Sequence, residues 1–193
     1  MAQSTLELLQ TRRTVTAAYL GDPGPSEAQI KDLVTIAMRV PDHGKLAPWR
    51  FIALSRDDRA AIAPRLHTIR EAQIDEAELP KLTKQLELFQ VAPLCLAVVG
   101  NAREHPAIPM WEQELSIGAS VMNLMIGAHA MGYSAQWLTG WASTSDQAKA
   151  LMGVKPEERI SAFVHIGTPQ VEPVDRPRPS LDDHLTFGLA AAE

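Results

Sequence analysis

The chain has 193 residues, of which 46% are hydrophobic and 21% are charged, and its formal net charge at pH 7 is -5. This length and this ordinary composition predict a single domain over residues 1–193 with a sizeable hydrophobic core. The mild negative charge argues against a nucleic-acid partner, because nucleic-acid-binding proteins usually carry a basic stripe.

The cysteine content and the apolar runs indicate a cytoplasmic protein. Cys95 is the single cysteine, so no disulfide can form within the chain, as is usual in a reducing compartment. The first seven residues lack the apolar segment of a signal peptide. Polar residues such as Ser120 and His129 interrupt the longest apolar stretch, residues 115–131, which predicts a buried helix and no membrane span.

Two capping boxes predict helices in the first 40 residues. Ser4 is followed three residues later by Glu7, and Ser26 is followed by Gln29, so each serine is expected to cap a helix N-terminus. Apolar residues then recur at helical spacing in the second segment, which is expected to end before Pro41.

A strand is predicted over residues 50–54, followed by a helix with Asp57 as its N-cap. Residues 71–90 have helical propensity, but they are strongly charged and Pro80 interrupts them. A pair of solvated surface helices explains this segment most simply, and a mobile cover over a functional site is the alternative.

The second half of the chain alternates strands and helices. The unbroken apolar run 94–100 is typical of an inner strand, and a long helix is expected from near Trp111 to Gly132. Small residues on this helix would let another helix approach closely, either within the domain or across a dimer. Two more strands are predicted over 134–138 and 160–166, so the order of elements indicates an α+β or three-layer α/β domain.

Several common enzyme motifs are absent from the sequence. It contains no Gly-x-Gly-x-x-Gly, no P-loop and no Gly-x-Ser-x-Gly. It also has no His-Glu-x-x-His, no Cys-x-x-Cys and no histidine pair at metal-ligand spacing, so no metal site is expected. Hydrolase, kinase and zinc-enzyme functions therefore find no support in the motifs.

Three short segments concentrate residues that suit a ligand. Arg12, Arg13 and Thr14 follow the first helix, and two guanidinium groups beside a hydroxyl suit a phosphate, although a solvated basic helix end explains them as well. Residues 39–49 place polar and cationic groups around two prolines, and residues 136–141 carry two tryptophans that suit stacking on a flat ring. An ordinary connection and a core strand are the simpler explanations for these two segments.

Five segments in register resemble the FMN-dependent nitroreductase family. They are Arg12–Thr14, residues 38–49, residues 109–116, Trp137–Gly140 and Gly167–Gln170, and together they span nearly the whole chain. The second to fifth are similar to segments of a subgroup, the small bacterial YdjA-like NAD(P)H nitroreductases. By this resemblance the sequence is identified as a member of the family.

The resemblance implies a three-layer α+β fold, with a central, mostly antiparallel sheet flanked by helices, and an intertwined homodimer with FMN at its interface. Carried over to this sequence, the FMN contacts of one chain are Arg12, Arg13, Thr14, Trp137, Leu138 and Thr139, and the partner chain adds Arg39 and His43. FMN would carry a hydride from NADH or NADPH to an electron-poor small-molecule acceptor. No side chain needs to act as a nucleophile, so no catalytic residue is assigned.

The sequence departs from the family at three positions. Leu138 stands where close relatives carry an arginine, Thr16 replaces a basic residue, and Ala47 replaces a glutamine. A C-terminal pair, Arg176 and Arg178, resembles the phosphate-binding Lys-x-Arg of the wider family. We therefore expect Arg178, with Arg176 as a second candidate, to hold the FMN phosphate in place of a residue at position 138.

The sequence leaves alternatives open. The acceptor is a nitro compound or a quinone, or instead an unsaturated carbonyl compound or a semialdehyde. A non-catalytic flavin-binding module would hold FMN without accepting a hydride, and a helical interaction protein would hold no cofactor. His43 is able to donate a proton, since histidine changes charge near neutral pH, but placement beside the flavin is the simpler role.

Overall fold

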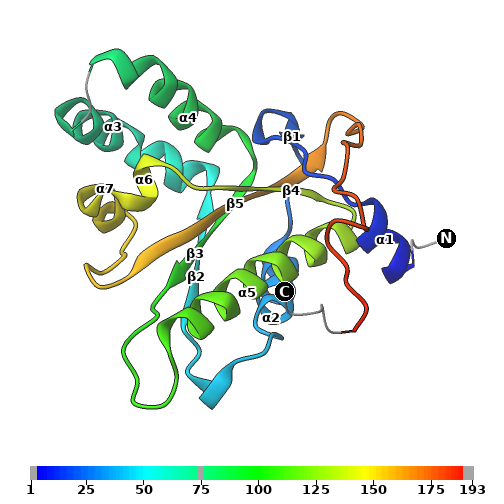
Figure 1. The fold of residues 1–193 in the computed structure, drawn as a ribbon. Coiled ribbons are helices and arrows are strands. Elements are labelled where there is room, and N and C mark those ends of the chain that lie inside the picture. The colour runs from blue at the N-terminus through cyan, green and yellow to red at the C-terminus, as the bar shows by residue number, and fades with distance from the viewer. Residues whose placement is uncertain (1–3, 74–75, 189–193) are drawn as a thin grey trace.

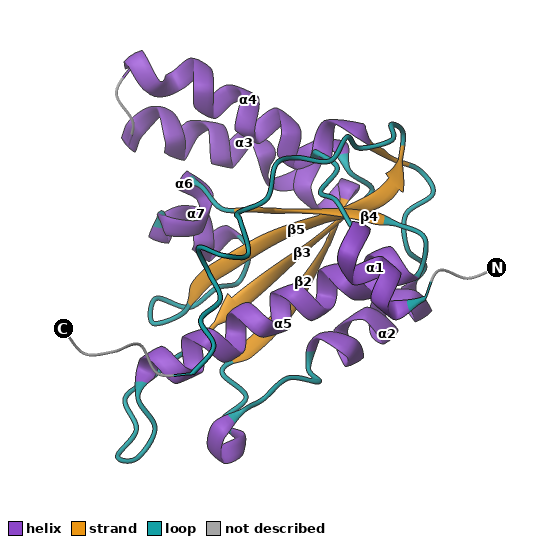
Figure 2. Cartoon of the chain, turned by 45° about the vertical axis from the view of Figure 1, so that its right-hand side comes forward, coloured by secondary structure: helices purple, strands orange, loops and turns teal. Residues whose placement is uncertain are grey.

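The computed structural model describes residues 4–73 and 76–188, which form three layers (Figure 1). A central sheet separates two layers of helices, as Figure 2 shows. Positions 74 and 75 of the predicted helical segment 71–90 lie outside the described residues. The predicted three-layer α+β fold is confirmed.

Every strand pairing in the described sheet is antiparallel, as the resemblance implied. β3 lies between β2 and β5, β4 pairs along the other side of β5, and β1 pairs with the last two residues of β5. The strands are β1 (Leu20–Gly21), β2 (Trp49–Ser55), β3 (Leu94–Gly100), β4 (Ser134–Leu138) and β5 (Arg159–Pro169). The predicted site residue Leu138 therefore ends the strand that lies beside β5.

Helices cover both faces of this sheet (Figure 2). One face carries α2 (Glu27–Ala37) and α5 (Met110–Ala130), with α1 (Thr5–Thr11) beside α5. The other face carries α3 (Arg56–Gln73), α4 (Leu79–Val91), α6 (Trp141–Thr144) and α7 (Asp146–Leu151). The two-sided cover explains the unbroken apolar run of β3, because alternate residues such as Leu96 and Ala97 pack against opposite helical layers.

The predicted helix starts at both capping boxes are confirmed. The Ser4 hydroxyl accepts a hydrogen bond from the backbone N–H of Glu7 at 3.2 Å. Ser26 and Gln29 form a complete capping box, in which each side chain accepts from the other residue's backbone N–H. These local signals were sufficient because capping acts within one helical turn.

One local prediction in the middle of the chain is wrong. Asp57 does not cap α3, because the Ser55 hydroxyl accepts the backbone N–H of Asp58 at 3.1 Å and takes that role. The helical segment 71–90 is interrupted near Pro80, since α3 ends at Gln73 and α4 begins at Leu79, and the proline lies in the first turn of α4, where its missing N–H has no helical partner to lose.

Two glycines of α5 show where its small residues allow close packing within the domain and where they leave room for a partner chain. Gly127 faces α2, where an added Cβ would lie 3.2 Å from the side chain of Ile36 and 3.3 Å from that of Leu33. This glycine therefore lets α2 and α5 pack closely within one chain. An added Cβ on Gly118 would meet nothing within 4 Å among the described residues, so this position of α5 faces open space in a single chain.

The helices, the possible metal ligands and the cysteine of the described residues were each considered for a special role. None of the helices there is long and apolar enough to cross a bilayer. The same ranges contain no group of three or more His, Cys, Asp or Glu side chains that could hold a metal ion. Cys95 is buried in β3, and burial raises the pKa of its thiol to about 12, so it packs as a small apolar residue.

A buried arginine holds the C-terminal end of α4. Arg59 of α3 donates to the backbone carbonyl oxygens of Ser55 at 3.0 Å, of Phe89 and of Ala92. Its guanidinium also lies over the Phe89 ring, 5.8 Å from the ring centroid. Carbonyl groups at a helix end carry partial negative charge, which compensates for the buried cation.

Replacing Arg59 with methionine keeps much of the side-chain length but leaves these carbonyl groups without a donor. We expect the free energy of unfolding to fall by about 2–4 kcal/mol, since buried unsatisfied acceptors are costly. Arg65→Met on the same helix is the control, because Arg65 is exposed and substitutions at exposed positions usually change the free energy of unfolding by about 0.5 kcal/mol or less. Urea denaturation followed by circular dichroism measures both variants, and equal losses would contradict the special role of Arg59.

Candidate functional site

Arginines from the two ends of the chain meet beside α1. The extended segment after this helix carries Arg12 and Arg13. The C-terminal tail, residues 171–188, returns to this segment (Figure 1), and the Arg13 Nε donates to the Val174 carbonyl oxygen at 3.1 Å. Burial, and then the nearby charges of Arg178 and Arg13, lower the pKa of Arg12. The structure therefore brings together three of the residues predicted to bind a phosphate.

This arginine cluster carries more positive than negative charge. Asp175 is the carboxylate in contact with it, 3.5 Å from Arg13 and 3.1 Å from Arg178. Among the described residues, the buried Nη1 of Arg12 and the buried Nε2 of His129 find no hydrogen-bond partner. Burial, followed by the charge of Arg12, lowers the pKa of His129 to about 4, so this ring is neutral at pH 7. An anion bound beside Arg12 would supply the missing partner and the missing negative charge.

A pocket of about 410 Å³ begins a few residues further along the same segment, which contributes Thr16 and Tyr19 to its lining. The pocket lies under α4, on the face of the sheet away from α5. Its walls are mainly apolar and aromatic, with Leu88 from α4, Phe163 from β5 and Trp141 from α6. Such a lining suits a flat, conjugated ring.

Two of the three neighbouring residues predicted to contact a flavin line this pocket: Leu138, which ends β4, and Thr139, which follows it and also lines a second cavity beside α5. Trp137 lines that second cavity, because side chains alternate along a strand, and its indole N–H donates to the carbonyl oxygen of Ser161 at 3.3 Å. Trp141, which the sequence analysis left out of the site, provides the aromatic wall instead. Alternation along β4 puts Trp137 and Leu138 on opposite faces, and the glycine at position 140 was the signal that Trp141 lies beyond the strand and does not follow this alternation.

Gly140 turns the chain from β4 into α6 at the edge of the pocket. Its φ of 151° and ψ of -167° belong to a region that residues with a side chain avoid. The Ser143 hydroxyl donates to the Gly140 carbonyl oxygen at 2.6 Å and holds the turn closed. The turn therefore places Thr139 and Trp141 on either side of a constrained backbone.

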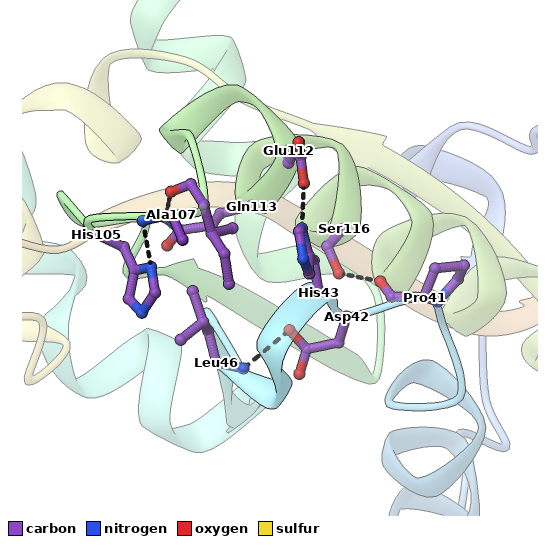
Figure 3. Close-up of polar contacts among 10 residues, drawn as sticks. Pro41, Asp42, His43, Leu46, His105, Ala107, Glu112, Gln113 and Ser116 are labelled. Atoms are coloured by element: carbon purple, nitrogen blue, oxygen red, sulfur yellow. Dashed lines mark hydrogen bonds and ion pairs between the residues drawn. The ribbon is translucent and has the colours of Figure 1, made fainter.

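A strained loop joins α2 to β2. Gly44, Lys45 and Ala47 have positive φ angles of 68°, 55° and 44°. This conformation is unfavourable for Lys45 and Ala47, which carry a Cβ, so surrounding contacts must hold the loop. The Asp42 carboxylate does so by accepting the backbone N–H of Leu46 at 3.1 Å, as Figure 3 shows. It also accepts the backbone N–H of Ala47 at 2.9 Å.

Arg39 and His43, the residues predicted to reach a partner chain, are exposed and lie beside α5. The His43 Nδ1 is 2.7 Å from the Glu112 carboxylate in the first turn of α5, as Figure 3 shows. Asn123 donates to the Arg39 carbonyl oxygen at 2.9 Å. These contacts hold residues 39–43, the first part of the connection after α2, against the surface of α5.

The length of α5 keeps His43 away from the arginine cluster. On this helix Glu112 contacts His43, and the charge of Arg12 acts on His129. The two helix residues are 17 positions apart, or about 25 Å at the α-helical rise. Within one chain, His43 and Arg12 are therefore too far apart to contact the same phosphate group. The pocket under α4 is also separated from His43 by the sheet.

Comparison with known proteins identifies the family of this chain. Residues 9–168 match the family model described as "Nitroreductase family". The chain is 31% identical over 169 residues to "Putative NAD(P)H nitroreductase YdjA" of Escherichia coli strain K12, and the match covers 86% of this chain and 89% of that protein. The chain belongs to the Nitroreductase family, which confirms the resemblance found in its sequence.

Solved structures with family-related names share the fold. A nitroreductase-like family protein from Bacillus cereus aligns with a TM-score of 0.80 at 17% identity, over 97% of both chains. A variant of the FMN and NADPH-dependent nitroreductase NfnB from Sphigopyxis sp. strain HMH gives a TM-score of 0.71 at 20% identity, over 96% of this chain and 99% of that one. These likenesses confirm the nitroreductase-like arrangement of sheet and helices.

Proposed function

We propose that this chain is an FMN-dependent oxidoreductase that transfers a hydride from NADH or NADPH, through bound FMN, to an electron-poor acceptor such as a nitro compound or a quinone. One observation carries the proposal: an arginine cluster with an unpaired buried donor leads along residues 12–19 into an aromatic-lined pocket. FMN has the matching parts, a phosphate with a charge of about -1.5 to -2 and a flat ring. The names of similar proteins support the same chemistry, since the Escherichia coli relative is called an NAD(P)H nitroreductase and a similar solved structure is that of an FMN and NADPH-dependent nitroreductase.

In this proposal Arg12, Arg13 and Arg178 bind the FMN phosphate. The planar guanidinium group suits phosphate oxygens, and charge-assisted hydrogen bonds are stronger than neutral ones. The hydroxyl of Thr14, on the same segment, is a further donor. Arg176 donates to its neighbour's carbonyl oxygen at 3.2 Å and is not among the charges that act on Arg12, so we assign the C-terminal contact to Arg178.

The flavin ring would bind at the pocket beside Leu138 and Thr139. Leu138 offers an apolar surface there, and Trp137 would contribute through its main chain, because its side chain lies on the other face. FMN supplies the hydride chemistry when bound, and these residues bind and orient it. The remaining space under α4 would admit the nicotinamide donor and then the acceptor, so no side chain is assigned a catalytic role.

We also propose that Arg39 and His43 act on the FMN of a second chain, in an intertwined homodimer. A single chain leaves His43 at the end of α5 opposite the arginine cluster, so the proposed site is incomplete without a partner. Near that end, α5 exposes Trp111 and Leu115, which are 60% and 64% accessible, beside the uncovered Gly118. Apolar side chains exposed in this way favour a partner surface, and a second copy supplies one by symmetry.

α1 and the C-terminal tail also carry exposed apolar side chains. Their large apolar side chains Leu6, Leu9, Leu181 and Phe187 are all at least half exposed. Burial of such side chains across a dimer would add to its stability. One domain over residues 1–193 and a cytoplasmic location complete the proposal.

The colour of the purified protein tests the proposed function. We expect a yellow protein whose flavin absorbance bleaches anaerobically with NADH or NADPH and returns with a nitro compound or a quinone. Because both half-reactions use one pocket, steady-state kinetics should be ping-pong. Colourless protein that cannot be reconstituted with FMN would refute the proposal. Bound FMN that neither donor bleaches would indicate a flavin-binding module, and reoxidation by unsaturated carbonyls or semialdehydes alone would reassign the acceptor.

Arg178→Ala tests the phosphate contact. We expect the Kd for FMN to rise about 10–100-fold, since a hydrogen bond to a charged group contributes about 1.5–3 kcal/mol. Riboflavin, which lacks the phosphate, should bind the variant and the parent equally. Quenching of flavin fluorescence measures both affinities, with Arg176→Ala as the matched control that leaves them unchanged. An Arg178→Ala variant that binds FMN as tightly as the parent would remove this residue from the site.

Mixing two defective variants tests the shared site. One chain carries Arg12→Ala with Arg178→Ala, and the other carries Arg39→Ala with His43→Ala. Each mixed dimer then has one site with all four changes and one site with none. Random mixing should restore about a quarter of the parent's FMN sites, because about half of the dimers are mixed. Mixed dimers, detected by native mass spectrometry, that regain no FMN would contradict the shared site.

A further inference from the structure

Glu112 and His43 form a short contact at the N-terminal end of α5 (Figure 3). The imidazole Nδ1 lies 2.7 Å from the Glu112 Oε2, and the side chains are 62% and 30% exposed respectively. Glu112 lies in the first turn of the helix, where a carboxylate is favourable. An Nδ1–H group that donates to a carboxylate fixes both the tautomer and the rotation of the ring.

The backbone of the strained loop is held without this contact. The Ser116 hydroxyl donates to the Pro41 carbonyl oxygen at 2.5 Å, and the Asp42 carboxylate closes the following turn (Figure 3). The Ile108 side chain fills the space that a Cβ on Gly44 would need, so the loop packs directly against the segment before α5.

That segment is itself held by a buried glutamine. The Gln113 side-chain amide donates to the carbonyl oxygens of Arg103 at 2.7 Å and Ile108 at 3.3 Å, and accepts the backbone N–H of Arg103 at 3.1 Å. The loop and the segment before α5 therefore form one rigid unit. These contacts do not restrain the rotation of the exposed His43 ring. The contact with Glu112 does.

We propose that Glu112 is a positioning residue, which holds the His43 imidazole so that its Nε2 is presented to the FMN bound by a second chain. The inference rests on the proposed function and adds to it a residue that orients the partner-chain contact. With Nδ1 engaged, Nε2 is the ring nitrogen left for a ligand: it accepts a hydrogen bond when His43 is neutral and donates one when His43 is protonated. Without Glu112 the ring must be ordered at the moment of binding, which weakens the affinity.

FMN affinity in a set of four variants tests this role. FMN-free full-length protein is titrated with FMN, and the Kd is measured by quenching of flavin fluorescence. We expect Glu112→Ala to raise the Kd about 3–10-fold, the cost of ordering one side chain. Glu112→Gln should restore most of the affinity, because its amide oxygen still accepts from Nδ1–H. The double variant Glu112→Ala with His43→Ala should bind no more weakly than His43→Ala alone, since Glu112 acts through His43.

The matched control is Glu114→Ala on the same helix. Glu114 pairs with Arg159 at 3.0 Å and does not contact His43, so its removal should leave the Kd unchanged. Imidazole ¹⁵N chemical shifts of His43 provide a second readout: the parent and Glu112→Gln should show one tautomer, and Glu112→Ala a mixture. A purely structural role would not change this spectrum in a variant with the parent's melting temperature.

The outcomes of these experiments distinguish a failure of the positioning role from a failure of the proposed function. Additive effects in the double variant, or a Glu112→Ala affinity equal to that of Glu114→Ala, would overturn the positioning role while FMN binding by the parent stands. If Glu112→Ala fails to fold, a tautomer mixture in folded Glu112→Gln, or its failure to recover the affinity, would overturn the role. A parent protein that binds no FMN would overturn the proposed function and this inference together.

Discussion

α5 is a rigid spacer on which the arrangement of the site depends. It has 21 residues and is about 30 Å long. Its N-terminal turn fastens the strained loop through Glu112 and Ser116, and its C-terminal end meets the arginine cluster through His129. Because a packed helix cannot shorten, the residues at its two ends stay apart in each chain. The proposed dimer follows from this length, since a second chain can bring opposite ends of two such helices together.

The positive charges of the arginine cluster repel one another at the place where the FMN phosphate is proposed to bind. Burial, and then the charges of Arg178 and Arg13, act against the charge of Arg12. A carboxylate contact from Asp175 relieves part of this repulsion. An anionic cofactor bound here would remove the rest, so its binding and the stability of the tail would be coupled. The alternation of β4 directs Leu138 to the pocket on the α4 side of the sheet and Trp137 to the cavity on the α5 side.

Local reasoning succeeded where the cause and its effect lie within a few residues. The serine caps of α1 and α2 are examples, as is β3, whose unbroken apolar run reflects helices on both faces. It failed at Asp57, where a nearby serine competes successfully for the same role. It also missed Trp141, which lines the pocket because the chain turns sharply at Gly140.

The sequence by itself determined the family, the class of fold and the segments that carry the candidate site, because capping, alternation and short motifs act between neighbours in the chain. Only the tertiary structure decided that Glu112 pairs with His43, that Arg178 lies near Arg12, and which tryptophan faces the pocket. These contacts join residues distant in sequence or depend on a turn in the backbone. Residue types and spacing along the chain do not specify such distances, which are set by how the helices pack on the sheet.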